Sequence, residues 1–308
     1  MQILIGGSYM KEKAMTIGKE QVADNPEQQE QDSILKCISK EINIIEQDFS
    51  IDLFKGKSIR LKRYITKSAK AIVGVTEYEL WKPIYEHVDA LDICQEYKEK
   101  LCKRFVQLNI YLKRLYYKYA KKLVCLDTNI PLTETACFSA CQGGFKFNQY
   151  NDMNEDLGVC NTYFHETAHM IDWLMGNAFC NASSNENMTG AIYQDYQTAI
   201  KNIKKQFGCD DIEAQVTLTC ILKQNTYAAL VASDVFDGAS GGKVYGRFRH
   251  GKDRSGKTYW EIRLPDALGK EAFAEIWAGI ACQSTSQIAF TQQYLPQTML
   301  KFNNITKG

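Results

Sequence analysis

The sequence predicts a mainly helical α+β protein with a small sheet, and three observations support this prediction. Apolar residues recur at helical spacing between residues 33 and about 122. Short β-prone stretches, two of them joined by a Gly-Gly turn, follow between about residues 123 and 148. Helical patterns then resume and continue towards the end of the 308-residue chain. We therefore divide the chain into a flexible polar leader (1–32), a helical region (33–122) and an α+β domain (123–308).

The composition limits where the protein acts and what it binds. The net charge is +1, so no global attraction to nucleic acid or to a membrane surface is expected. No apolar run approaches the ~20 residues that span a bilayer. The start of the chain, Met1–Gly7, lacks the basic region of a signal peptide, so we expect a cytoplasmic location without a membrane partner. The 11 cysteines include no Cys-x-x-Cys pair, which indicates reduced, mostly buried thiols.

The first part of the chain changes from polar to helical character. Residues 11–32 cannot bury enough apolar surface to become ordered alone, which predicts the flexible leader. Apolar residues then repeat at helical spacing, namely Ile34, Leu35, Ile38, Ile42, Ile45 and Phe49. A capping box, Thr76–Glu79, predicts the start of another helix ahead of Leu80 and Trp81.

A long helix is predicted from about Asp89 to Leu123. One face of it is apolar, and the opposite face carries nine basic residues: Lys98, Lys100, Lys103, Arg104, Lys113, Arg114, Lys118, Lys121 and Lys122. We interpret the basic face as the solvated side of a bundle helix. The alternative is a contact with nucleic acid or an acidic protein. Nothing in the stretch specifies bases or phosphates, so nucleic acid is not favoured.

Strands and further helices are predicted after the long helix. Three strands are expected at 123–126, 136–140 and 145–148, and the last two form a hairpin through Gly143 and Gly144. Helices are expected at roughly 188–207 and 210–233. An irregular region then begins near Gly238, and Pro265 begins a final pair of helices. A sheet placed just before the segment described next could pair with an extended peptide, or it could simply cover a helix.

The segment Thr162–Trp173 contains His165-Glu166-x-x-His169, the zinc motif of metallopeptidases. On a helix, the two histidines project from one face, one turn apart, so they can bind the same ion. Glu166 lies about 100° around the helix, from where it can reach a water on that ion. The chain has only four histidines, so two satisfied core histidines at this spacing would be an unusual use of them.

A catalytic zinc ion usually takes three protein ligands, and the sequence offers two candidates for the third. Asp172 is on the same helix, but its side chain is short and one turn too far along, which favours a role in orienting His169 or in packing at the helix end. Glu271 and Glu275 form an i,i+4 pair on a separate predicted helix, with Ala274 and Ala278 allowing close approach. Two carboxylates facing a buried site require a neutralising cation.

These motifs resemble known zinc peptidases. A Glu-x-Phe-Ala-Glu segment far after His-Glu-x-x-His resembles the anthrax lethal factor type of glutamate zincin. The second half of the chain resembles more closely the metallopeptidase domain of phage minor head (head morphogenesis) proteins and related prophage proteins. The matching stretches follow in the family's order along residues 123–303: Thr162–Trp173, Ser233–Phe236, Gly242–Gly246, His250–Gly251, Leu268–Glu275 and Tyr294–Pro296. An insertion around Lys252–Lys257 departs from the family's pattern.

The resemblance implies a zincin-like fold for residues 123–308 and a zinc ion (Zn²⁺) held by His165, His169 and Glu271. It implies that Glu275 supports these ligands and that Glu166 accepts a proton from the zinc-bound water and passes it to the leaving amine. The tetrahedral oxyanion needs another donor. His250, Tyr245 and Tyr259 are candidates because they lie between the two predicted metal-bearing helices, and we favour His250 or Tyr259.

Three functions are compatible with this sequence. The first is a zinc metalloendopeptidase of a phage or mobile element that cleaves a peptide or protein substrate. The second is a phage head assembly protein, in contact with portal or capsid subunits and associated with the virion, whose zincin domain is weak or inactive. The third is a metalloprotease toxin that acts on a host protein. The motif pair favours the first.

Overall fold

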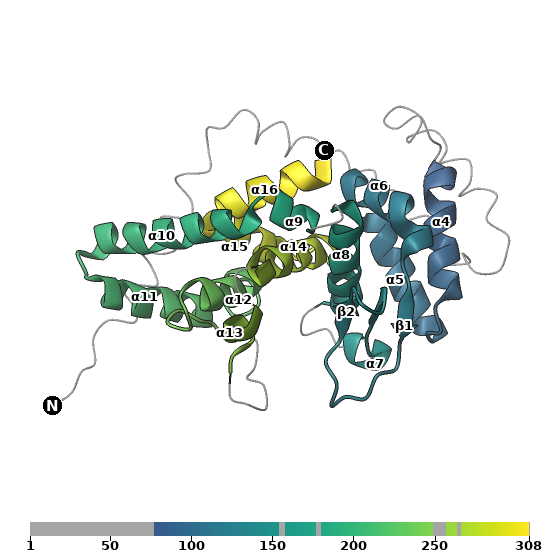
Figure 1. Cartoon of the computed structure of the whole chain (residues 1–308), viewed down its shortest axis with the longest axis horizontal. Coiled ribbons are helices and arrows are strands. Elements are labelled where there is room, and N and C mark those ends of the chain that lie inside the picture. Colours follow the sequence, from purple (N-terminus) through teal and green to yellow (C-terminus); the bar gives the residue numbers. More distant parts are fainter. Residues whose placement is uncertain (1–76, 154–157, 177–179, 249–256, 264–265, 308) are drawn as a thin grey trace. The chain divides into compact units, whose positions relative to one another are not determined.

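The computed structural model describes residues 77–153, 158–176, 180–248, 257–263 and 266–307, which all belong to one compact unit, Lys62–Gly308. This unit is mainly helical and carries a small three-stranded sheet, which confirms the predicted α+β class (Figure 1). The predicted leader and the helical pattern of residues 33–49 lie outside the described residues. Within the described ranges, no helix is both long and apolar enough to cross a lipid bilayer.

The prediction of a single long helix over 89–123 is wrong, because the helix is interrupted between residues 107 and 110. The elements up to the sheet are α4 (Glu77–Ala90), α5 (Gln95–Gln107), α6 (Ile110–Tyr119) and the 3₁₀ turn η1 (Ala120–Lys122). At the break, Leu108 and Asn109 have extended backbones with ψ of 144° and 158°. The Asn109 side chain accepts a hydrogen bond from the Leu112 N–H, so it caps α6 and favours a new helix over a continuous one.

The basic face of this region is partly neutralised. Lys98 lies 3.6 Å from the Asp89 carboxylate and Lys100 lies 3.0 Å from Glu96. Farther on, Lys118 lies over the ring of Tyr119. The Asp89 and Glu96 carboxylates are exposed, whereas the Lys98 side chain is only 17% exposed, so this face is solvated only in part.

The predicted hairpin is confirmed, and it forms part of a sheet with the order β1-β3-β2. The strands are β1 (Cys125–Asp127), β2 (Cys137–Ser139) and β3 (Gly144–Lys146). β2 pairs antiparallel with β3, with Phe138 opposite Phe145, and Gly143 supplies the positive φ of 69° in the turn. β1 pairs with β3 in parallel. β2 is therefore an edge strand, with one side not paired to another strand of the sheet.

The helix that carries the His-Glu-x-x-His motif, α8 (Asn161–Met175), begins at a buried acid. Its N-cap residue, Cys160, makes no side-chain capping bond. Instead Asp152, at the end of α7 (Gln149–Asp152), accepts hydrogen bonds from the N–H groups of Thr162 (2.7 Å) and Tyr163 (2.8 Å). The carboxylate also accepts from the hydroxyl of Tyr97 on α5 at 2.5 Å. Asp152 thus caps α8 and connects it to the preceding helices.

The remaining chain contains more helices than the sequence predicted. They are α9 (Ala182–Asn185), α10 (Met188–Phe207), α11 (Asp211–Gln224), α12 (Leu230–Ala239), α13 (Tyr259–Arg263), α14 (Asp266–Ala281), α15 (Thr285–Tyr294) and α16 (Pro296–Lys307). The helix predicted for 210–233 is two helices, because the Asn225 amide bonds the Ile221 carbonyl and ends α11. The final pair is three helices, because Gln283 adopts a left-handed φ of 56° after α14.

The core lies where α8 packs against α14, side by side in Figure 1. On α8, Thr167 points away from the histidines and meets the hydroxyl of Tyr116 on α6 at 2.6 Å. The indole N–H of Trp277 on α14 donates to the same hydroxyl at 3.2 Å. All three side chains are buried. One buried tyrosine therefore fixes α8 and α14 relative to each other, and buried hydrogen bonds of this kind specify a single packing.

We predict that Asp152→Asn lowers the free energy of unfolding by about 2–3 kcal/mol, because a buried acceptor of charge-assisted bonds is replaced by a group that also donates. Urea denaturation, in a chelator so that metal binding does not contribute, measures the change. Asp89→Asn is the control, because the Asp89 side chain is 68% exposed and pairs with Lys98 at 3.6 Å; a change below about 0.5 kcal/mol is expected. Equal losses in both variants would contradict the capping role.

Candidate metal centre

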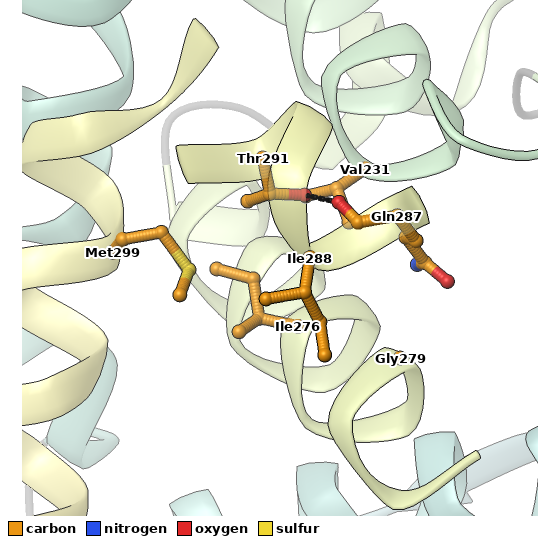
Figure 2. A pocket seen from close by; sticks show the side chains of 7 residues that line it. All are labelled: Val231, Ile276, Gly279, Gln287, Ile288, Thr291 and Met299. Carbon is orange, nitrogen blue, oxygen red and sulfur yellow. Dashed lines mark hydrogen bonds between the residues drawn. The ribbon is translucent and has the colours of Figure 1, made fainter. Parts of the chain in front are cut away.

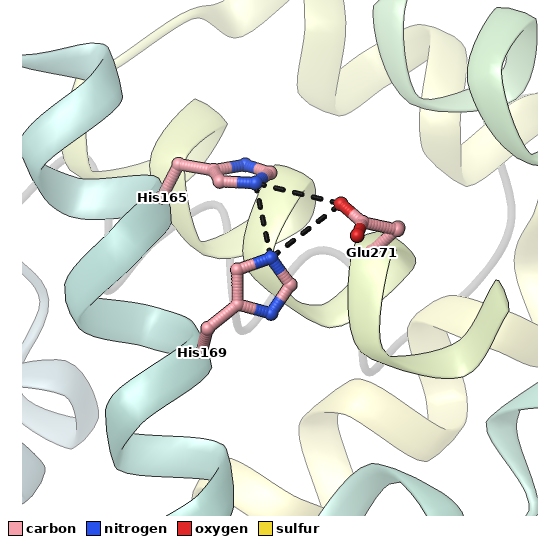
Figure 3. A group of neighbouring side chains, drawn as sticks. All are labelled: His165, His169 and Glu271. Carbon is pink, nitrogen blue, oxygen red and sulfur yellow. Dashed lines mark hydrogen bonds and ion pairs between the residues drawn. The ribbon is translucent and has the colours of Figure 1, made fainter. Parts of the chain in front are cut away.

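Three side chains from two helices converge on one point (Figure 3). His165 and His169 come from successive turns of α8, and their Nε2 atoms lie 3.1 Å apart. Glu271 comes from α14, and its Oε2 lies 3.5 Å from His165 Nε2 and 3.4 Å from His169 Nε2. The sequence disfavoured Asp172 as the third ligand and its family resemblance implied Glu271, and the structure brings Glu271 to the histidines.

The spacing of these three atoms fits a tetrahedral metal ion. Zinc binds imidazole nitrogen and carboxylate oxygen at about 2.0–2.1 Å, so two ligand atoms of a regular tetrahedron lie about 3.3 Å apart. The observed separations of 3.1, 3.4 and 3.5 Å bracket that value. Each of the three atoms lies close to both of the others, as Figure 3 shows. The residues therefore fit a metal site with three protein ligands.

The charges around this cluster also favour a cation. Burial lowers the pKa of His165, but the carboxylates around it, Glu271 and Glu275 foremost, outweigh burial and raise that pKa to about 10. Burial alone would raise the pKa of Glu271, yet the two histidines hold it well below its usual range. Both shifts show that the site stabilises positive charge on its nitrogens and negative charge on its oxygens. A bound cation satisfies the same field.

Glu166 lies beside the cluster and is tied to the edge strand. Its side chain is buried, and its carboxylate accepts a hydrogen bond from the backbone N–H of Phe138 on β2. Burial raises the pKa of Glu166, while the charges of His165 and His169 act in the opposite direction. A carboxylate with a raised pKa, bonded by a backbone N–H beside a group of possible metal ligands, is suited to accept a proton and return it.

Glu275 lies one turn after Glu271 and faces the other nitrogen of His165. Its Oε1 is 3.6 Å from His165 Nδ1, whereas the Nε2 atom of the same ring faces the common centre. Metal-binding histidines are commonly oriented by a carboxylate on the nitrogen that does not bind the metal. The arrangement supports the role that the resemblance implied for Glu275, which is to orient a ligand rather than to be one.

Asp172 lies near the C-terminal end of α8, where it accepts hydrogen bonds from the start of α9. Its buried carboxylate accepts hydrogen bonds from the Ser183 N–H (2.7 Å), the Ser183 hydroxyl (2.6 Å) and the Asn181 side-chain amide (3.2 Å). These groups belong to the start of α9, so Asp172 packs at the helix end and fixes α9 there. Packing at the helix end was one of the two roles that the sequence left open for this residue.

Tyr259 contacts a ligand of the cluster. Its hydroxyl donates to Glu271 Oε1 at 2.7 Å, while Glu271 Oε2 faces the histidines. Burial and the adjacent Glu271 carboxylate raise the pKa of Tyr259, so it stays protonated as a donor. The tyrosine thus leaves a single carboxylate oxygen for an ion. Its predicted contact with an oxyanion stays a prediction.

The other two donor candidates are placed differently. His250 lies outside the described residues. Tyr245 is described, and the ammonium group of Lys223 on α11 lies 4.3 Å from the centre of its ring. That contact anchors the tyrosine to α11.

Two residues, one beside Glu166 and one on the histidine face of α8, were not among the site residues predicted from the sequence. One is Phe138, whose contribution is a backbone N–H that no side-chain motif reveals. The other is Trp173, which the motif includes only as an apolar flank. Its spacing of four residues from His169 was the available signal, because it places the indole on the face of α8 that bears the two histidines.

A small hollow elsewhere in the fold is not a comparable site. It lies between α12, α14, α15 and α16, and its cavity volume is about 10 Å³ (Figure 2). Ligand pockets usually hold about 300 Å³ or more. None of its lining side chains carries a charge or binds metals strongly: Val231, Ile276, Gly279, Gln287, Ile288, Thr291 and Met299. It is a packing gap at the rim of the core.

Comparison with known proteins leaves the site to be interpreted from its own geometry. No protein-family model, curated protein or solved structure matches this chain. The resemblance to phage head proteins and to lethal factor therefore stays a prediction.

We predict that the purified protein binds about one zinc ion per chain and that Glu271→Ala removes most of it, because the third ligand is lost. Elemental mass spectrometry on proteins prepared side by side measures the content. Glu186→Ala, a glutamate of 44% side-chain exposure beside Lys301, is the matched control and should retain zinc. Full zinc content in Glu271→Ala would show that the third ligand is another residue.

We predict that Tyr259→Phe weakens zinc binding about 10- to 100-fold, the usual effect of losing a hydrogen bond to a ligand. Competition with a chromogenic chelator measures the affinity directly. Tyr150→Phe is the control, because the Tyr150 side chain is 62% exposed on α7. An unchanged affinity in Tyr259→Phe would mean that the contact with Glu271 does not orient the carboxylate.

Proposed function

We propose that this protein is a zinc-dependent peptidase that hydrolyses peptide bonds. The observation that carries the proposal is the convergence of His165, His169 and Glu271 at the spacing of tetrahedral ligands, with Glu166 buried beside them. Three protein ligands leave a fourth position for water or substrate, which distinguishes catalytic zinc sites from closed structural ones.

The ligand set supports zinc over other common cations. Two imidazoles and one carboxylate form a donor set that zinc prefers, whereas Mg²⁺ and Ca²⁺ take six or more oxygen ligands. When bound, zinc would lower the pKa of a water molecule and polarise a carbonyl group.

Glu166 supplies the proton transfer that hydrolysis needs. It is next to a ligand in sequence but is not one itself, so its carboxylate is available to accept a proton at the metal-bearing face. The Phe138 N–H fixes its orientation. The same carboxylate can then return the proton to the amine that leaves, as a general acid.

The edge strand supports a peptide as the substrate. β2 ends the sheet, runs beside α8 and contacts the proposed base through Phe138. An extended chain can be recognised at such an edge through backbone hydrogen bonds, independent of its sequence. Because the Phe138 N–H already bonds Glu166, a peptide at this edge would bond the Phe138 carbonyl. A peptide held there would lie along the metal-bearing face of α8.

We predict that Glu166→Gln retains zinc and lowers the rate of peptide cleavage at least about 100-fold, because the amide cannot accept the proton. Zinc-loaded proteins are incubated with a mixture of unfolded proteins, and new termini are mapped by mass spectrometry. Glu186→Gln is the matched control. Cleavage at the same sites and rates by Glu166→Gln would contradict the proposal, and so would the absence of cleavage by the zinc-loaded wild type.

A further inference from the structure

The metal-bearing face of α8 continues beyond the histidines to an exposed tryptophan. His165, His169 and Trp173 follow one another at intervals of four residues, so their side chains lie along one stripe of the helix. Trp173 is 40% exposed, whereas the apolar neighbours Phe164 and Ile171 are fully buried. The exposed indole therefore lies one turn from a proposed metal ligand.

The tryptophan forms a pair with the edge strand. The ring of Phe138 lies 5.8 Å from the indole of Trp173, tilted by 47°. Phe138 is itself partly exposed, and its backbone N–H is the group that holds Glu166. One residue thus joins the proposed base to an accessible aromatic surface. A single exposed aromatic residue is common on protein surfaces. A pair of aromatic residues next to the proposed base is a more specific feature.

The charges beside this pair are already compensated. Lys146 is the partner of Cys137 in the sheet register, next to Phe138, and its ammonium group bonds Glu134 at 2.9 Å. Both members of this ion pair are satisfied by each other. This ion pair carries no net charge, so the exposed parts of the two rings suit an uncharged side chain.

A peptide paired with β2 would point alternate side chains towards the two faces of the strand. We propose that Trp173 and Phe138 form a subsite for an aromatic or large aliphatic side chain within two residues of the bond that is cleaved. The inference rests on the proposed peptidase function and specifies its substrates, which are extended peptide segments with a large apolar residue at that position. Stacking against two rings, together with burial of both, supplies the preference.

Two peptide hydroxamates test the subsite without requiring turnover. The hydroxamate group binds zinc through oxygen, and the two compounds differ only in the adjacent side chain, benzyl in one and methyl in the other. Calorimetry with the zinc-loaded full-length protein measures both affinities. We expect the benzyl compound to bind about 10- to 100-fold more tightly, the range that a filled apolar pocket provides.

Three variants assign the preference to the aromatic pair. Trp173→Ala should reduce it to about threefold or less while the zinc content stays unchanged, and Trp173→Phe should restore most of it. Phe207→Ala is the matched control, because Phe207 is 46% exposed at the end of α10 and should leave the preference intact.

The outcomes separate this inference from the function on which it rests. Equal binding of the two hydroxamates by the wild type overturns the subsite but leaves the metal centre standing. A benzyl preference that survives Trp173→Ala also overturns the subsite. If neither compound binds to zinc-loaded protein, the open metal position is contradicted, and the proposed function fails together with the inference.

Discussion

The packing of α8 against α14 is the constraint on which the rest of the structure depends. The histidines are on one helix and Glu271 is on the other, so a shift of either helix would separate the ligand atoms. Fully buried Ala168 on α8 and Ala272 on α14 show how little side-chain volume these helices place in the core. On the opposite side of α8, Tyr116 bonds both helices through Thr167 and Trp277 and fixes their relative position.

Charge balance explains why the site is built from these groups. Glu166 and Glu271 are almost fully buried, and Glu275 is 14% exposed. Burying ionised carboxylates is unfavourable unless a positive charge compensates them. Two imidazoles supply part of that charge only when protonated, whereas a divalent cation between them supplies it with the rings neutral. The shifted pKa values of His165 and Glu271 reflect the same imbalance. The buried carboxylates therefore require a compensating cation, and the same carboxylates help to bind it.

Local patterns could be predicted from the sequence, and long-range geometry only in part. The spacing of His165 and His169 determines their common face whatever surrounds the helix. The hairpin was predictable because Gly143 supplies the positive φ that its turn requires. The break of the expected long helix at Asn109 could not be predicted. The apolar stripe continues through this position and favours one helix, whereas the Asn109 side chain caps a new one. The contact of Tyr259 with Glu271 and the Phe138 N–H at Glu166 depend on how separate elements pack, which no local pattern specifies.

X-ray absorption at the zinc edge is the most direct test of the metal centre, because it reports the atoms bound to the metal in the intact protein. We expect two imidazole nitrogens and oxygen from a carboxylate and water, at about 2.0–2.1 Å, with no sulfur. The chain has 11 cysteines, so zinc bound elsewhere would be revealed by sulfur at about 2.3 Å. Sulfur in the first coordination shell, or a shell of oxygen alone, would contradict a site made by His165, His169 and Glu271.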